Sequence, residues 1–206
     1  MDSLEQNIRL LVQDVLSKMD LSEAASSPKA PAAAPAAPLE ELGPGLFADM
    51  ESAIAAAKIA QQELVKLTLV TRRKIIAAMR KATLDNNDLL SRLAVEETGF
   101  GRVEDKLIKH ALVANKTPGV EDLRPSAFSD DDGMALIEQA PWGVIGAIIP
   151  STNPSSTVVC NGIGMIAAGN AVVFGPHPMA KKVSGMAVKL MNQAIVSAGG
   201  PMNLIT

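Results

Sequence analysis

Apolar positions in the first half of this chain recur every three or four residues, which is the spacing of one face of an α-helix. This pattern runs from Leu46 to Lys116, and helix-stop residues such as Gly99 and Pro118 mark where individual helices end. The spacing predicts four helices, over residues 47–66, 71–84, 85–97 and 103–115.

Past residue 133 the apolar runs become short and rich in β-branched residues, which favours strands. The clearest runs are Val144 to Ile149 and Ala171 to Phe174, each bounded by Pro and Gly. A run over residues 134–139 follows a turn signal at residues 130–133 and predicts another strand. A further run, over residues 202–205, begins a strand near the end of the sequence.

Helical segments separate these strands. Pro154 and the hydroxyl residues after it suit a helix start, Gly169-Asn170 suits a helix end, and residues 179–198 carry another apolar stripe. The order is therefore β-α-β-α-β, which requires right-handed crossovers and parallel strands. The predicted fold class is α/β, the first part of a doubly wound sheet. Polar groups should gather at the carboxyl end of its first strand.

Residues 3–19 form a separate amphipathic stretch with capping-box spacing at its start. Half of residues 20–45 are Ala or Pro, which indicates an extended, mobile linker. A helix this short is marginal in water, so its apolar face needs a partner surface. It could fold back on its own domain, but a long tether suits a separate partner better. Arg9 and Lys18 are its only basic residues, which disfavours a membrane surface.

Composition excludes several classes of function. A net charge of −3 and 2% aromatic residues leave no basis for nucleic-acid binding. Cys160 is the only cysteine, no CxxC or HExxH occurs, and His110 and His177 are the only imidazoles, so we expect neither a disulfide nor a metal site. No run approaches about 18 apolar residues and the start is unlike a signal peptide. We therefore expect a cytoplasmic protein that binds no membrane.

Two features of the helix after the first parallel strand have competing interpretations. Gly162, Gly164 and Ala167 match the dinucleotide fingerprint G-x-G-x-x-A, but they fall inside the helix rather than in the turn that precedes it. Close packing on the sheet or on a neighbouring subunit explains them better. Cys160 lies in the same apolar helix and is interpreted as a small buried hydrophobe rather than as a nucleophile.

Charged clusters in the helical region are interpreted as solvent-exposed faces rather than as a phosphate site or an acid–base pair. They are Arg72, Arg73, Lys74, Arg80 and Lys81 on one predicted helix and Glu96 and Glu97 on another. The acidic run at residues 130–132 lacks the spaced ligands of a calcium-binding loop.

Asn153 stands at the carboxyl end of the first parallel strand, between Thr152 and Pro154. Its side-chain amide could donate a hydrogen bond to an oxyanion that develops on a substrate. It could equally form an Asx turn with its own backbone. The residue type and its place are compatible with both roles.

Four linked elements resemble the aldehyde dehydrogenase superfamily over residues 46–206. They are Pro141-x-Gly143-Val144, Ile149-Pro150-x-x-Asn153-Pro154, the run Ala-Ala-Gly-Asn-Ala-Val-Val from Ala167 to Val173, and Pro176. The resemblance implies the N-terminal part of a Rossmann-like NAD-binding domain in which Asn153 donates to the oxyanion of a thiohemiacetal. It also implies two loops that border the nicotinamide cofactor. These are Ile149, Pro150, Ser151 and Thr152 after the first strand and Gly175, Pro176 and His177 after the second.

Two departures from the general family pattern narrow this resemblance. Hydrolytic members usually carry Lys-Pro-Ser where this chain has Gly175-Pro176-His177-Pro178, which is similar to coenzyme-A-acylating members. Residues 3–19 and their linker are similar to encapsulation peptides of acylating enzymes in bacterial microcompartments. The resemblance implies oxidation of a short-chain aldehyde, acetaldehyde or propionaldehyde, with NAD and with coenzyme A as co-substrate. It also implies a shell protein as partner of residues 3–19, location in the compartment lumen, and a homo-oligomer when intact.

The catalytic Cys of this family lies well downstream of the Asn, and no cysteine of this chain matches it. We therefore expect an N-terminal fragment of a longer enzyme that is inactive alone. The alternative is that the chain is a catalytically inactive targeting or assembly module that binds a shell or a scaffold.

Overall fold

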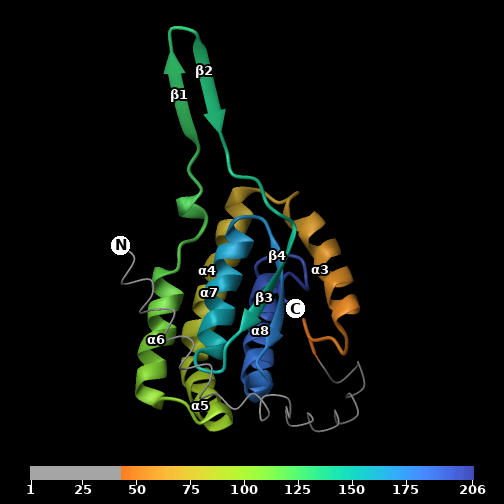
Figure 1. The fold of residues 1–206 in the computed structure, drawn as a ribbon, viewed down its shortest axis with the longest axis vertical. Coiled ribbons are helices and arrows are strands. Elements are labelled where there is room, and N and C mark those ends of the chain that lie inside the picture. Colours follow the sequence, from red (N-terminus) through yellow and green to blue (C-terminus); the bar gives the residue numbers. More distant parts are fainter. Residues whose placement is uncertain (1–42) are drawn as a thin grey trace, which may run out of the picture. The chain divides into compact units, whose positions relative to one another are not determined.

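The computed structural model describes residues 43–206 (Figure 1). The predicted helix over residues 3–19, and all but the last three residues of the predicted linker, lie outside this range. Gly45 is buried with a φ of +80°, and a Cβ at this position would meet the side chain of Asn192. Close packing therefore fixes the backbone at Gly45, the last residue of the predicted linker.

All four helices predicted between residues 46 and 116 are present, each within a few residues of its expected ends. They are α3 (Met50–Leu64), α4 (Leu69–Asp85), α5 (Asn87–Thr98) and α6 (Val103–Lys116). Asp49 and Thr68 cap the starts of α3 and α4 by accepting hydrogen bonds from backbone N–H groups. Gly99 ends α5 in the left-handed region, with a φ of 71°, as its place in the sequence predicted.

The second half of the chain forms β3 (Val144–Ile149), α7 (Pro154–Ala167), β4 (Ala171–Pro176) and α8 (Lys181–Ser197). A short 3-10 turn, η3 (Pro178–Ala180), leads into α8. The strands β3 and β4 pair in parallel, and Val172 of β4 forms a parallel bridge to Ile205. This bridge is the start of a third strand. The predicted β-α-β-α-β order and the α/β fold class are confirmed.

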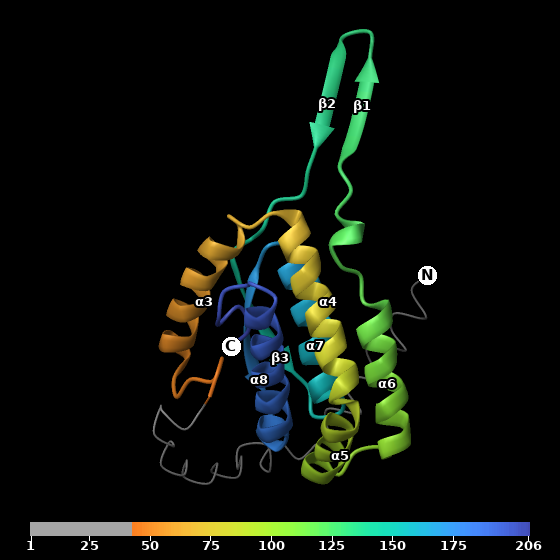
Figure 2. The same ribbon diagram turned by 180° about the vertical axis from the view of Figure 1, so that it is seen from behind.

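Helices enclose the paired strands. In Figures 1 and 2, α3 lies on one side of β3 and β4, while α4 and α7 lie on the other. The core between them contains fully buried side chains from both halves of the chain, among them Ile75, Met79, Ile163, Ile166, Met191 and Ile195. A Cβ at Gly162 would lie 2.9 Å from Cδ1 of Ile205, so this glycine lets α7 approach the third strand. The packing interpretation is confirmed for Gly162, whereas a Cβ at Gly164 would meet nothing within 4 Å.

A β-hairpin extends from the helical part between α6 and β3 (Figure 1). After the 3-10 turn η2 (Val120–Asp122), strands β1 (Ser126–Asp130) and β2 (Gly133–Ile137) pair antiparallel. The predicted strand over residues 134–139 is β2, and the predicted turn before it is present, with Asp130 accepting from the backbone N–H groups of Asp132 and Gly133. The sequence analysis missed β1. All ten strand residues are exposed.

Three charged side chains that the sequence analysis placed on solvated faces bind the ends of neighbouring helices instead. Arg80 donates to the carbonyl oxygens of Ala114 and Thr117 at the end of α6, both at 2.7 Å. Arg72 donates to the carbonyl of Ala167, the last residue of α7. The Glu97 carboxylate accepts from the backbone N–H groups of Lys182 and Val183 at 2.8 and 2.7 Å.

The surface interpretation is therefore wrong for Arg72, Arg80 and Glu97. Helix ends leave backbone groups without partners inside the helix, and a charged side chain from an adjacent helix can supply one.

No helix within residues 43–206 is both long enough and apolar enough to cross a membrane.

Candidate functional site

Asn153 occupies the junction between β3 and α7, immediately before the first helical residue, Pro154. Its backbone carbonyl accepts from the N–H group and the hydroxyl of Thr157, at 3.0 and 2.6 Å. Its side chain makes no hydrogen bond that caps the helix. The side-chain amide is therefore not used to start α7. Its proposed role in catalysis stays a prediction.

The side chain of Asn153 is held by α6, a helix 44 positions earlier in the sequence. The Lys109 ammonium donates to Oδ1 of Asn153 at 2.7 Å. One turn earlier, the Lys106 ammonium donates to the carbonyl oxygen of Thr152. Lys106 is only 5% exposed, and burial, followed by repulsion from Lys109, lowers the pKa of its ammonium.

His110, the next residue of α6, completes a buried hydrogen-bond chain. Nε2 of His110 lies 2.7 Å from the Ser155 hydroxyl, and Nδ1 lies 2.9 Å from the Ser91 hydroxyl. The Ser91 hydroxyl donates a hydrogen bond to Oδ1 of Asn87, and the Asn87 amide donates in turn to the carbonyl of Leu107. Ser91 must therefore accept from Nδ1–H of His110, and Nε2 must accept from Ser155.

This histidine is neutral in the folded protein. Burial, with the nearby charge of Lys106 as the second cause, lowers the pKa of His110 to about 4. The side chain is 1% exposed and both ring nitrogens have partners. His110 thus connects α5, α6 and the start of α7.

The sequence analysis did not identify Lys106, Lys109 or His110 as site residues. Their spacing of i, i+3 and i+4 was a usable signal, because it places three polar side chains on one helical face. What the spacing could not show is which segment that face meets.

The structure brings the two loops predicted to border the cofactor together. The backbone N–H of His177 donates to the carbonyl of Ile149 at 3.0 Å, so the carboxyl ends of β3 and β4 lie side by side. Pro150, Thr152 and His177 are exposed, and Ser151, Gly175 and Pro176 are partly buried. Ile149 differs because its side chain is fully buried in the core, which leaves only its backbone to face a ligand. The cofactor role of all seven residues stays a prediction.

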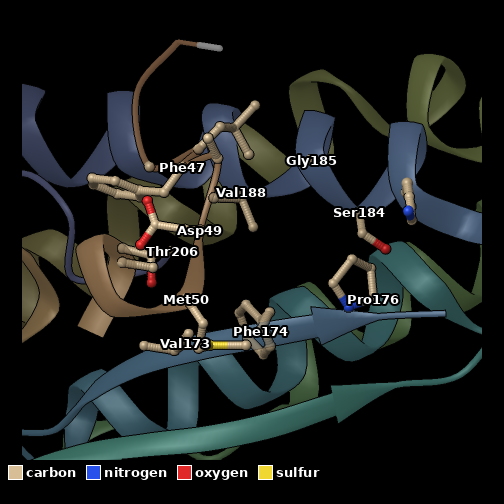
Figure 3. Close-up of a pocket in the computed structure, with 15 residues that line it drawn as sticks. Phe47, Asp49, Met50, Val173, Phe174, Pro176, Ser184, Gly185, Val188 and Thr206 are labelled. Atoms are coloured by element: carbon tan, nitrogen blue, oxygen red, sulfur yellow. The ribbon is translucent and has the colours of Figure 1, made fainter. Parts of the chain in front are cut away.

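A cavity of about 390 Å³ lies beside the end of β4 (Figure 3). Its walls are mainly apolar and include Phe47, Val173, Phe174 and Val188. Figure 3 shows Ser184 and Pro176 at one end and Phe47 and Thr206 at the other. Of the residues predicted to contact the cofactor, only Pro176 lines this cavity.

Ser184 and Thr206 contribute two of the polar groups that line this cavity. The hydroxyls of Ser184 and Thr206 are buried and have no hydrogen-bond partner within the described residues. Within residues 43–206, no three His, Cys, Asp or Glu side chains gather in a way that could hold a metal ion.

The fold is an α/β unit with parallel strands, and comparison with known proteins gives its family. The aldehyde dehydrogenase family matches residues 34–206, and the chain belongs to that family. The acetylating acetaldehyde dehydrogenase EutE of Escherichia coli is 49% identical over 201 residues, which are 98% of this chain and 40% of that protein. The resemblance to coenzyme-A-acylating members is thereby confirmed.

Solved structures of similar enzymes share this part of the fold. A propionaldehyde dehydrogenase from the Clostridium phytofermentans fucose utilisation bacterial microcompartment is 55% identical with a TM-score of 0.77, covering 79% of this chain and 37% of that one. The Rhodopseudomonas palustris propionaldehyde dehydrogenase with bound propionyl-CoA is 46% identical with a TM-score of 0.78, covering 87% and 40%. The chain thus spans about two fifths of the length of these relatives.

Proposed function

We propose that this chain forms the first part of an enzyme that oxidises acetaldehyde or propionaldehyde to its acyl-coenzyme A. The observation that carries the proposal is the orientation of the Asn153 side chain, whose Oδ1 accepts from Lys109 and whose amide N–H groups are left to donate elsewhere. The similarity to an acetylating acetaldehyde dehydrogenase and to propionaldehyde dehydrogenases supports both aldehydes as substrates.

Asn153 would stabilise the negative charge that forms on the aldehyde oxygen when a thiolate adds to the carbonyl carbon. Cys160 lies within α7 and is not placed at the strand ends, so the thiol that attacks would come from residues outside this chain. When bound, NAD accepts the hydride and coenzyme A accepts the acyl group. Residues 149–152 and 175–177, at the carboxyl ends of β3 and β4, would border NAD.

Turnover of the full-length enzyme tests this role directly. Replacing Asn153 by Ala removes one oxyanion donor, which typically slows turnover about 100-fold or more. The measurement is NADH formation that depends on both acetaldehyde and coenzyme A. Asn115→Ala is a matched control, because the Asn115 amide donates to the carbonyl of Ala111 in its own helix. Near-normal turnover of Asn153→Ala would contradict the role of Asn153 as an oxyanion donor.

We also propose a division of the chain into a targeting helix (residues 1–19), a linker (residues 20–45) and a partial NAD-binding domain (residues 46–206). The origin of one similar enzyme in a bacterial microcompartment supports a shell protein as partner and the compartment lumen as location. Deleting residues 3–19 should leave aldehyde oxidation intact and abolish co-sedimentation with shells. Co-sedimentation without these residues would refute the targeting role.

The alternative is an inactive targeting or assembly module, and it makes a different prediction. NADH formation by the 206-residue chain alone, dependent on aldehyde and coenzyme A, would contradict it.

A further inference from the structure

One face of α6 contacts the end of the loop that carries Asn153 and the first turn of α7. Lys106 binds the backbone of Thr152, Lys109 binds the side chain of Asn153, and His110 binds the side chain of Ser155. The contacts join positions 44 to 46 residues apart in the sequence. Since α6 is a regular helix, the three contacts come from a single rigid element.

The contact with Lys109 decides which way the Asn153 amide faces. A lysine ammonium has only hydrogen-bond donors, so the amide oxygen must face it and the amide nitrogen must face the other way. A rotated amide would turn its oxygen toward the substrate and oppose a developing negative charge. At 2.7 Å the bond is charge-assisted, a kind roughly twice as strong as one between neutral groups.

We propose that Lys109 is a positioning residue that keeps the amide N–H groups of Asn153 directed at the oxyanion. This inference rests on the proposed function of Asn153. Lys109 acts through the amide and does not touch the substrate. Lys106 holds the backbone carbonyl of Thr152 and His110 holds the hydroxyl of Ser155, so that rotation of the Asn153 side chain is the freedom that Lys109 removes.

Substitution of Lys109 in the full-length enzyme provides the first test. Lys109→Met keeps most of the side-chain length and removes the donor, so kcat for acetaldehyde should fall about 10-fold, less than the loss caused by removing Asn153 itself. The KM for NAD should stay unchanged. Lys109→Arg restores a donor and should recover most of the lost turnover.

Lys116→Met is the matched control, because Lys116 is exposed at the end of the same helix. It should leave kcat and the thermal midpoint unchanged. Lys109 is also exposed, so Lys109→Met should keep the wild-type thermal midpoint, which separates loss of orientation from loss of folding. Turnover of Lys109→Met equal to that of the control would overturn the inference.

A double-mutant cycle separates positioning from any independent effect of the charge. If Lys109 acts through Asn153, adding Lys109→Met to Asn153→Ala should cause no further loss of kcat. A further loss of about 10-fold in the double variant would overturn the positioning role.

The outcomes distinguish this inference from the proposed function. A full-length enzyme that produces no NADH from acetaldehyde or propionaldehyde would refute the function. An active enzyme that is slowed by Asn153→Ala but not by Lys109→Met would refute only the role of Lys109.

Discussion

The loop between β3 and α7, together with the first turn of α7, and the hairpin at residues 126–137 are held in opposite ways. Backbone, hydroxyl and amide groups of the loop bind α6, and through His110 they connect to α5. The strands of the hairpin pair with each other, and their side chains are exposed throughout, including Met134 at 77% and Leu136 at 64%. The difference shows that a segment outside the regular core can be fixed by a few polar contacts.

The two regions should also differ in how much they contribute to the free energy of unfolding. A two-stranded ribbon is marginally stable alone, so changes on its surface should cost the domain little. The contacts between the loop and α6 include the buried groups of Lys106, His110 and Ser155, each of which depends on a partner. Changes in the two regions should therefore differ in their effect on the free energy of unfolding.

Among the tests of this comparison, lowering the pH should cause the largest change in the free energy of unfolding. The pKa of His110 is lowered from 6.5 to about 4, so between these values the unfolded chain takes up a proton that the folded protein does not bind. The free energy of unfolding should be at its full value above pH 6.5 and fall as the pH drops, by roughly 3 kcal/mol near pH 4.

Urea unfolding at pH 7, 6, 5 and 4 measures this slope. His110→Gln should remove most of the slope, even though it also lowers the stability at pH 7. His177 is exposed, so His177→Gln should leave the slope as it is. An unchanged slope in His110→Gln would show that other groups cause the acid sensitivity.

Removing a single hydroxyl from the network should have the next largest effect. Ser155→Ala leaves Nε2 of His110 buried without a donor, which should cost about 1–3 kcal/mol. Ser129→Ala makes the same chemical change on the exposed strand β1 and should stay within about 0.5 kcal/mol of the wild type. Equal effects in chemical denaturation would contradict the contrast between the two regions.

The smallest effect is expected from an apolar side chain of the hairpin. Leu136→Ser removes a large hydrophobic group that is 64% exposed, so the free energy of unfolding should change by less than about 0.5 kcal/mol. Leu90→Ser on α5 removes the same side chain from a fully buried site and should cost several times more. A large loss of stability in Leu136→Ser would mean that the hairpin packs against another surface and contributes to folding.

The sequence predicted what depends on local pattern. The runs at Val144 to Ile149 and Ala171 to Phe174 gave the parallel strands, and Gly99 and Gly169 marked helix ends, because apolar spacing and backbone conformation are local properties. Strand β1, with the sequence Ser-Ala-Phe-Ser-Asp, lacks a β-branched or alternating pattern, and only its pairing with β2 makes it a strand.

Contacts between distant segments could not be predicted in the same way. Asn153 was placed correctly at a strand end, but Lys109 lies 44 positions away and looked like any surface lysine. Glu97 and Arg72 were misjudged for the same reason, since each binds the end of a helix that is distant in sequence. A charged residue reveals its partner only when the packing of helices is known.

The two ammonium groups of α6 also set the electrostatic potential at the carboxyl end of β3. Lys106 and Lys109 approach the loop within one helical turn of each other, and the N-terminus of α7 adds its own partial positive charge beside them. The field is therefore positive before any ligand arrives, and charge that builds up on a carbonyl oxygen meets dipoles already in place. The same field would repel a ligand that carries an ammonium group at this strand end.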